Sequence, residues 1–201
     1  PGSPGGPQLQ PGQQTVFEKT LNSENLSAEE IELMLGMADK DEYIDDANKI
    51  SPKISVTKEI KTIAKGNDAN TYVTLNIKNV GDETYKDIFI IEIIPKEILQ
   101  SAKDIKSNNK YGIVTEDPII EYNIAELKKG ENEKFEYYFK KDLSKLKEED
   151  IDKWEAAFAY DGEEAKGLCA NVICKVIACK ESTCNLDDGK CKYADMKEGT
   201  N

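Results

Sequence analysis

One apolar run, Asp87–Lys96 (DIFIIEIIPK), constrains this chain more than any other feature: six of its ten residues are Ile or Phe. A continuous run rich in β-branched residues is typical of a strand buried on both faces. It is too short for a membrane span, which needs about 20 apolar residues. Because Pro95 cannot donate to a neighbouring strand, we expect the strand to end there. The run therefore predicts the central strand of a β-sandwich, with one charged residue, Glu92, inside it.

Alternating apolar and polar residues on both sides of this run predict further strands. The pattern is regular at 73–77, 120–124 and 135–139, and turn residues rich in Asn, Asp and Gly separate the segments. Ile54 and Val56 also alternate, and the shift to Ile60 and Ile63 predicts a β-bulge between them. Further strands are expected at 111–115, 156–160 and 168–177. About seven or eight short strands joined by hairpin turns favour a mainly β, immunoglobulin-like sandwich, with a layered α+β fold as the alternative.

Helices are predicted ahead of the strands and between them. Ser27–Glu30 (SAEE) has the sequence of a capping box, and the apolar residues that follow fall at helical spacing. On this basis residues 15–50 are assigned to an N-terminal helical segment. A short helix is expected at 96–106, and one or two more at 142–154 as a lid over one end of the sandwich.

Composition divides the chain into four parts. Residues 1–14 are almost entirely Pro, Gly and Gln, which cannot form a core, and they are predicted to be a disordered linker or tag. The helical segment at 15–50, a β-sandwich domain at 51–178 and a Cys-rich tail at 179–201 follow. No leader or transmembrane run is visible, and because the chain starts at Pro1 a leader or anchor could lie outside this fragment.

All five cysteines lie in the last 33 residues. Their spacing contains no C-x-x-C pair, which disfavours a zinc ribbon and an iron–sulfur cluster. Disulfides are the favoured interpretation, and the Asp-Gly turn between the last two cysteines would let these two meet. An odd number leaves one thiol free, paired with another chain, or without its partner. Disulfides imply an oxidising compartment. The candidates are Cys169, Cys174, Cys179, Cys184 and Cys191.

The absence of His and Arg narrows the function. All 27 basic residues are Lys, so the commonest general base, the commonest metal ligand and the guanidinium fork are all missing. The net charge of −12 argues against nucleic acid and against anionic lipid. We therefore expect no enzymatic activity, no cofactor and no metal centre. The abundance of Lys, Glu and Ile fits a heat-adapted proteome or an A/T-biased genome.

Other candidate sites have a structural explanation beside the functional one. Glu92 is either an acid whose protonation is altered by burial or, as we favour, a carboxylate that bonds a Lys or lies at a sheet edge. The carboxylate runs at 148–150 and 163–164 could bind calcium, but a solvated surface is favoured. Residues 39–45 lack the Gly of an EF-hand loop. The strand aromatics are expected in the core and in cross-strand pairs, and not in a sugar-stacking platform; they are Tyr122, Tyr137, Tyr138 and Phe139.

Four motifs occur in order along residues 51–160: Leu75–Glu83, Ile93–Glu97, Asp117–Ile120 and Ala125–Glu131. Together they resemble a β-sandwich repeat of archaeal cell-surface and S-layer-associated proteins, similar to CARDB-type adhesion domains. The resemblance implies an extracellular, non-catalytic module used for spacing, adhesion or lattice contacts. Such modules have no fixed active site, so no functional residue is carried over.

The sequence thus predicts a structural or adhesion module of the cell surface or envelope. It would act by contact with other surface proteins or with copies of itself, for example by pairing of edge strands. It is expected neither to bind nucleic acid nor to insert into a membrane within this fragment. The alternatives are an extracellular ligand-binding module for a glycan or Ca²⁺, an accessory domain of a larger envelope protein, and an enzyme that uses carboxylates, Lys or Tyr.

Overall fold

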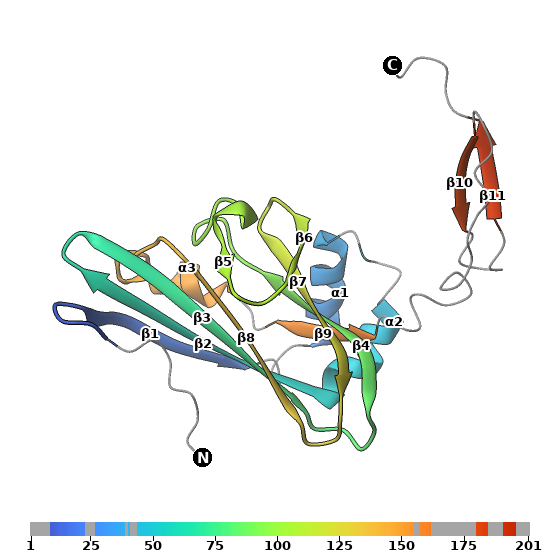
Figure 1. The fold of residues 1–201 in the computed structure, drawn as a ribbon, viewed down its shortest axis with the longest axis horizontal. Coiled ribbons are helices and arrows are strands. Elements are labelled where there is room, and N and C mark those ends of the chain that lie inside the picture. Colours follow the sequence, from blue (N-terminus) through green and yellow to red (C-terminus); the bar gives the residue numbers. More distant parts are fainter. Residues whose placement is uncertain are drawn as a thin grey trace. The chain divides into compact units, whose positions relative to one another are not determined.

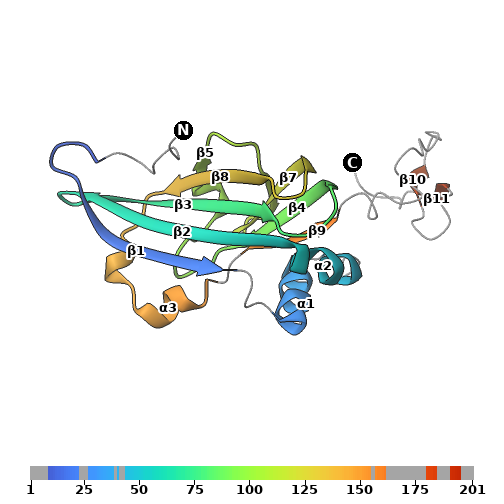
Figure 2. The ribbon, with the colours of Figure 1, turned by 90° about the horizontal axis from the view of Figure 1, so that it is seen from below.

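The computed structural model describes residues 9–22, 27–38, 40, 44–154, 157–161, 180–184 and 191–195, and the statements below concern these residues. The chain divides into two units, Pro1–Asp161 and Gly162–Asn201. The first unit is mainly β and contains two antiparallel sheets with short helices, as Figures 1 and 2 show. The second contains a hairpin of β10 (Lys180–Cys184) and β11 (Cys191–Asp195). The division falls before the predicted boundary at 178/179.

The first unit has one five-stranded and one four-stranded sheet. The five-stranded sheet has the order β1-β2-β3-β8-β5, and the four-stranded sheet has the order β6-β7-β4-β9. The strands of the first sheet are β1 (Gln14–Asn22), β2 (Ile54–Lys65), β3 (Asp68–Asn79), β8 (Asn132–Phe139) and β5 (Lys106–Ser107). Those of the second are β6 (Gly112–Thr115), β7 (Ile119–Leu127), β4 (Tyr85–Ile93) and β9 (Phe158–Asp161).

The apolar run forms β4, as predicted. β4 is an inner strand of the four-stranded sheet, hydrogen-bonded to β7 on one side and to β9 on the other. Ile88 and Ile90 belong to the core between the sheets, whereas Ile91 belongs to a second apolar cluster under the helices. Both faces of the strand are therefore buried, which explains why its sequence shows no polar alternation.

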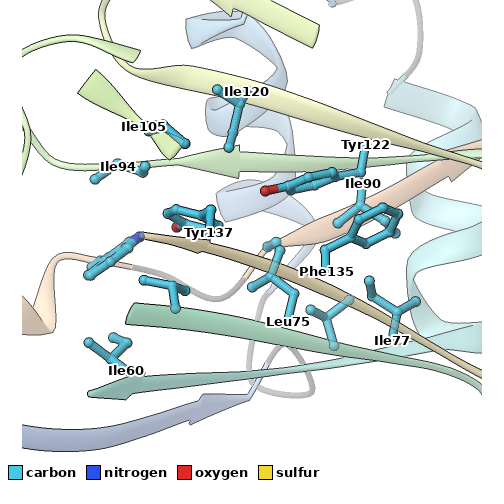
Figure 3. Close-up of a cluster of buried hydrophobic side chains, with 14 of the residues drawn as sticks. Ile60, Leu75, Ile77, Ile90, Ile94, Ile105, Ile120, Tyr122, Phe135 and Tyr137 are labelled. Carbon is cyan, nitrogen blue, oxygen red and sulfur yellow. The ribbon is translucent and has the colours of Figure 1, made fainter. Parts of the chain in front are cut away.

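The main core lies between the two sheets. Figure 3 shows Leu75 and Ile77 of β3 facing Ile90 and Tyr122 of the other sheet, and all four side chains are buried. The Tyr122 ring stacks on the ring of Phe135 with centroids 4.1 Å apart. Each sheet contributes every second residue of its strands to this layer. The alternation of apolar and polar residues in the sequence therefore indicates which face of a strand points inward.

Helices cover the outer face of the four-stranded sheet. α1 (Ala28–Met37) and α2 (Ile44–Ile50) pack on β4, β7 and β9 through the second cluster. The predicted capping box is present: Ser27 accepts from the Glu30 backbone N–H, and the Glu30 carboxylate accepts from the Ser27 N–H at 2.6 Å. None of the described helices has the length and apolar content of a membrane span. The remaining short helices are η3 (Ser51–Lys53), η4 (Ala102–Asp104), η5 (Leu143–Lys145) and α3 (Glu148–Asp152).

The helical assignment of residues 15–50 is wrong at its start. Gln14–Asn22 is β1, which pairs antiparallel with β2. From Phe17 onward, half-buried residues of β1 alternate with exposed ones, with the period of two that is typical of a strand. The half-buried residues are Phe17, Lys19 and Leu21. The capping box lies further along the chain, and the helix begins only there, with Ser27 as its N-cap. In the predicted 1–14 linker, Gln14 belongs to β1 and residues 1–8 lie outside the described residues.

The predicted bulge in β2 is also wrong. β2 pairs with β3 along its whole length without a register shift. Every second residue from position 54 to position 60 is buried, and one of these buried residues is a lysine. They are Ile54, Val56, Lys58 and Ile60. The irregularity lies in the neighbouring strand, where the register of β1 shifts between Thr15 and Phe17.

The predicted helix at 96–106 is replaced by a turn and the short η4. An isolated segment of this length is a marginal helix former, so packing and not local spacing decides its structure. Ile98, Leu99 and Ala102 are nevertheless buried in the main core, so the apolar pattern there reports packing and not a helix. The strand predicted at 168–177 lies outside the described residues.

Candidate functional site

A buried polar cluster joins the two sheets in the middle of the main core. Lys58 of β2 and Glu92 of β4 form an ion pair with Nζ and Oε1 2.9 Å apart, and both side chains are fully buried. The same Oε1 accepts hydrogen bonds from the Tyr137 hydroxyl and the Trp154 indole N–H, each at 2.8 Å. Lys58 Nζ also lies 4.7 Å from the centre of the Trp154 ring, within reach of a cation–π interaction.

The hydrogen bonds of the cluster are unevenly distributed over its oxygen atoms. One carboxylate oxygen of Glu92 takes part in all three of these polar contacts, while Oε2 and the hydroxyl of Tyr122 have no hydrogen-bond partner among the described residues. Burial, and after it the charge of Glu92, raises the pKa of Tyr122 and of Tyr137 far above the usual value. Both tyrosines are therefore neutral at any physiological pH.

Sequence reasoning found Glu92 and missed Lys58. The favoured explanation of Glu92, that it bonds a Lys, is confirmed, although it lies on an inner strand and not at a sheet edge. Lys58 could have been found from its phase, since it falls two residues after Val56 and two before Ile60. An acid, a lysine and two tyrosines form a set that catalysis could use. The ion pair is fully buried, however, so its observed contacts are with core residues and not with solvent.

The other predicted site residues are not brought together. Tyr122, Tyr137 and Phe139 are buried core residues, as expected, and they do not form a sugar-stacking platform. Tyr138 lies on the opposite face of β8, 37% exposed and stacked on Tyr72 at 5.4 Å. The described part of the chain contains no group of three or more Cys, Asp or Glu that could hold a metal ion. In the carboxylate run of α3, Glu149 pairs with Lys147, and Asp150 pairs with Lys153.

Two of the five cysteines lie in described residues. Cys184 ends β10 and Cys191 begins β11, and the two are opposite each other in the hairpin register. The backbone thus places together the two cysteines that the turn prediction paired, while the disulfide itself stays a prediction. Cys169, Cys174 and Cys179 lie outside the described residues, as does the carboxylate pair at 163–164.

The outermost strand β1 is a second candidate site. β1 is the last strand of the five-stranded sheet and is hydrogen-bonded only to β2 within the described residues. Beside it lies a groove of about 390 Å³ with walls from Phe17–Lys19 of β1 and from η5 and α3, with no residue of β2. An ion pair between Lys19 and Asp152 connects the strand to α3 across this groove.

The other sheet edges differ from β1 in length. β5 has two residues, and β6 and β9 have four each, whereas β1 has nine. Very short edge strands are one of the devices by which proteins avoid unwanted strand pairing. β1 does not use this device, and beyond the irregularity at Thr15–Phe17 its register with β2 continues unbroken to Asn22. The long edge therefore presents a row of backbone groups that an extended segment can bind.

Comparisons with family models, with curated proteins and with solved structures gave no match.

Proposed function

We propose that this chain is a non-catalytic structural or adhesion module of the cell surface that works by protein–protein contact through the β1 edge. In this proposal the two sheets form an immunoglobulin-like sandwich of the CARDB type, and the cysteine-rich unit is closed by disulfides. The observation that carries the proposal is the nine-residue outermost strand beside a groove, in a molecule whose other outermost strands have four residues or fewer among the described residues.

The chemistry of the edge suits strand addition. Six residues in continuous register, Phe17–Asn22, span about 20 Å at 3.4 Å per residue. Main-chain hydrogen bonds along such an edge provide affinity, and pockets for alternate side chains provide specificity. The groove next to Phe17 is a pocket of this kind, lined in part by Leu146 and Ile151. A second copy of β1 can supply the added strand, which would make the contact symmetric.

The test is self-association of the whole chain, measured by light scattering and sedimentation over a wide concentration range. Successive backbone N–H groups of a strand point to opposite sides, so Lys19→Pro and Thr20→Pro remove donors from different edges of β1. The variant that loses an inward donor should be destabilised, and the other should fold normally. We expect the stable variant to remain monomeric where the natural chain dimerises.

A synthetic peptide with the sequence of residues 14–22 serves as the second probe, since it should compete with dimerisation by occupying the same edge. Val80→Gln, which changes an exposed side chain in the connection between β3 and β4, is the matched control. A natural chain that stays monomeric at every concentration and does not bind the peptide would overturn the proposal.

A further inference from the structure

A second surface feature is an apolar groove at the outer face of the four-stranded sheet. Its volume is about 700 Å³, and it lies between α1 and the segments that follow β4 and precede β7. Leu33, Met34 and Met37 form the α1 wall, and Ile93 and Pro95 are among the residues opposite. Leu33 is 66% exposed and Met37 55% exposed, which makes them the two most exposed of the large apolar side chains on the described surface.

The spacing of the apolar residues along α1 explains why Leu33 and Met37 are exposed. Ile31, Met34 and Leu35 face the sheet and are buried, and they account for the packing of the helix. Leu33 and Met37, four residues apart, form a separate stripe that this packing does not use. Contiguous apolar surface of this kind, framed by charged residues, marks an interaction site more often than a scattered single residue does. Methionine side chains adapt to differently shaped partners, and two of them line the groove.

Charge indicates what kind of partner fits. The helix that forms one wall of the groove, α1, contains three Glu and no Lys, a net charge of −3. In α1, Glu29 precedes Leu33 by four residues on the same helix face, and Glu30 lines the groove itself. The groove Lys residues are already paired, Lys96 with Asp117 and Lys153 with Asp150.

This charge disfavours three occupants. A second copy of the groove would bring two α1 helices of net charge −3 together, and like charges that face each other weaken an interface. Anionic lipid and nucleic acid are repelled in the same way. A segment with apolar side chains along one face and Lys or Arg on its flanks satisfies both the apolar groove and the acidic helix beside it.

We propose that this groove binds a basic amphipathic helix from a partner protein. Apolar residues at i, i+3 or i+4, and i+7 of the partner would contact Leu33 and Met37, the mode in which amphipathic helices occupy grooves. Basic residues of the partner would lie against Glu29 and Glu30. This surface is separate from β1, and the proposal does not depend on strand pairing.

The test uses a fluorescently labelled 14-residue peptide of Leu and Lys, with Leu at helical spacing, and a matched peptide in which Glu replaces every Lys. Anisotropy titrations with the full chain should show binding of the Lys peptide only, weakening as salt is raised. The double variant Leu33→Gln, Met37→Gln keeps the charge and the helix propensity, and we expect it to weaken binding about tenfold or more, since the apolar contacts are lost. Val80→Gln is again the control and should bind normally.

Each outcome has one meaning. Equal binding by the Leu33→Gln, Met37→Gln variant would show attraction to acidic surface in general and would overturn the proposal, as would equal binding of the Glu peptide. A double variant that alters the oligomeric state of the natural chain would make the groove a contact between copies, which also overturns it. The stable Pro variant of β1 should bind the Lys peptide normally, so this proposal and the proposed β1 contact can fail independently. Thermal unfolding of every variant confirms that the fold is retained.

Discussion

Two ion pairs in different regions of this molecule have almost the same geometry and opposite surroundings. Lys58 and Glu92 are 2.9 Å apart between the sheets, with both side chains 0% exposed. Lys140 and Asp68 are 2.7 Å apart on the surface, with both side chains 75% exposed. An exposed ion pair keeps most of its hydration and contributes little to stability. A buried ion pair loses its hydration, and only its mutual attraction and its hydrogen bonds can offset that loss. The contact distance alone therefore says nothing about what each pair contributes.

The largest expected effect comes from leaving one buried charge without its partner. Glu92→Gln keeps an oxygen that can accept from Tyr137 and Trp154, but it leaves the buried charge of Lys58 without the Glu92 carboxylate. We expect a loss of about 3–5 kcal/mol in the free energy of unfolding. Lys58→Met leaves the buried Glu92 carboxylate without its lysine and should lower the free energy of unfolding by a similar amount. Urea unfolding followed by the fluorescence of Trp154 measures both.

The double variant Lys58→Met, Glu92→Gln is the control for this prediction. It removes both charges and retains the acceptor oxygen, so it should be more stable than either single variant by about 2 kcal/mol or more. If the two single losses simply add, the two charges are not coupled, and the buried pair does not act as one unit in the core.

The sequence predicts the local parts of this fold better than it predicts the buried cluster. The β4 run, the Ser27–Glu30 capping box and the β2–β3 and β3–β4 turns could be predicted, because each depends on local spacing. The partner of Glu92 could not, because it comes from a strand more than thirty residues earlier in the chain. The prediction for β1 was wrong for the same reason, because its partner strand β2 lies more than thirty residues later in the chain and the pairing is not visible in a local pattern.

The next prediction compares two buried tyrosines. Tyr137 donates a 2.8 Å hydrogen bond to Glu92, whereas the Tyr122 hydroxyl has no partner among the described residues. Tyr137→Phe should therefore cost about 1.5–3 kcal/mol, the usual range for a hydrogen bond to a charged group, while Tyr122→Phe should be neutral or slightly stabilising. Unfolding free energies of the two variants, measured in parallel, decide the matter. Equal losses would contradict the asymmetry of the cluster.

Alkaline pH provides a smaller, graded test. Burial, followed by the charge of Glu92, raises the pKa of Tyr122 and Tyr137 in the folded protein, while in the unfolded chain both ionise near pH 10. Above that pH the unfolded state binds fewer protons than the folded one, so stability is complete below about pH 10 and falls as pH rises. Each tyrosine contributes about 1.4 kcal/mol per pH unit to this slope.

Tyr122→Phe should remove one tyrosine's share of the alkaline slope without a loss of stability at neutral pH. Lysines also lose their charge in this range, but they do so equally in both proteins, and the difference between the two slopes isolates the tyrosine. Tyr138→Phe changes an exposed side chain on the outer face and serves as the control. Identical slopes for all three proteins would mean that Tyr122 is not held neutral by the fold.

The smallest effect is expected at the surface pair, and it completes the comparison. The hydrogen bond and the charge of Lys140 lower the pKa of Asp68, so the contribution of this carboxylate is present at neutral pH and is lost as pH falls through its folded pKa. Because both groups are exposed and screened by salt, Asp68→Asn should not shift the urea midpoint measurably at physiological ionic strength, and any difference at low salt should disappear as salt is added. A midpoint shift comparable to that of Glu92→Gln would show that contact distance, and not burial, governs the strength of ion pairs in this fold.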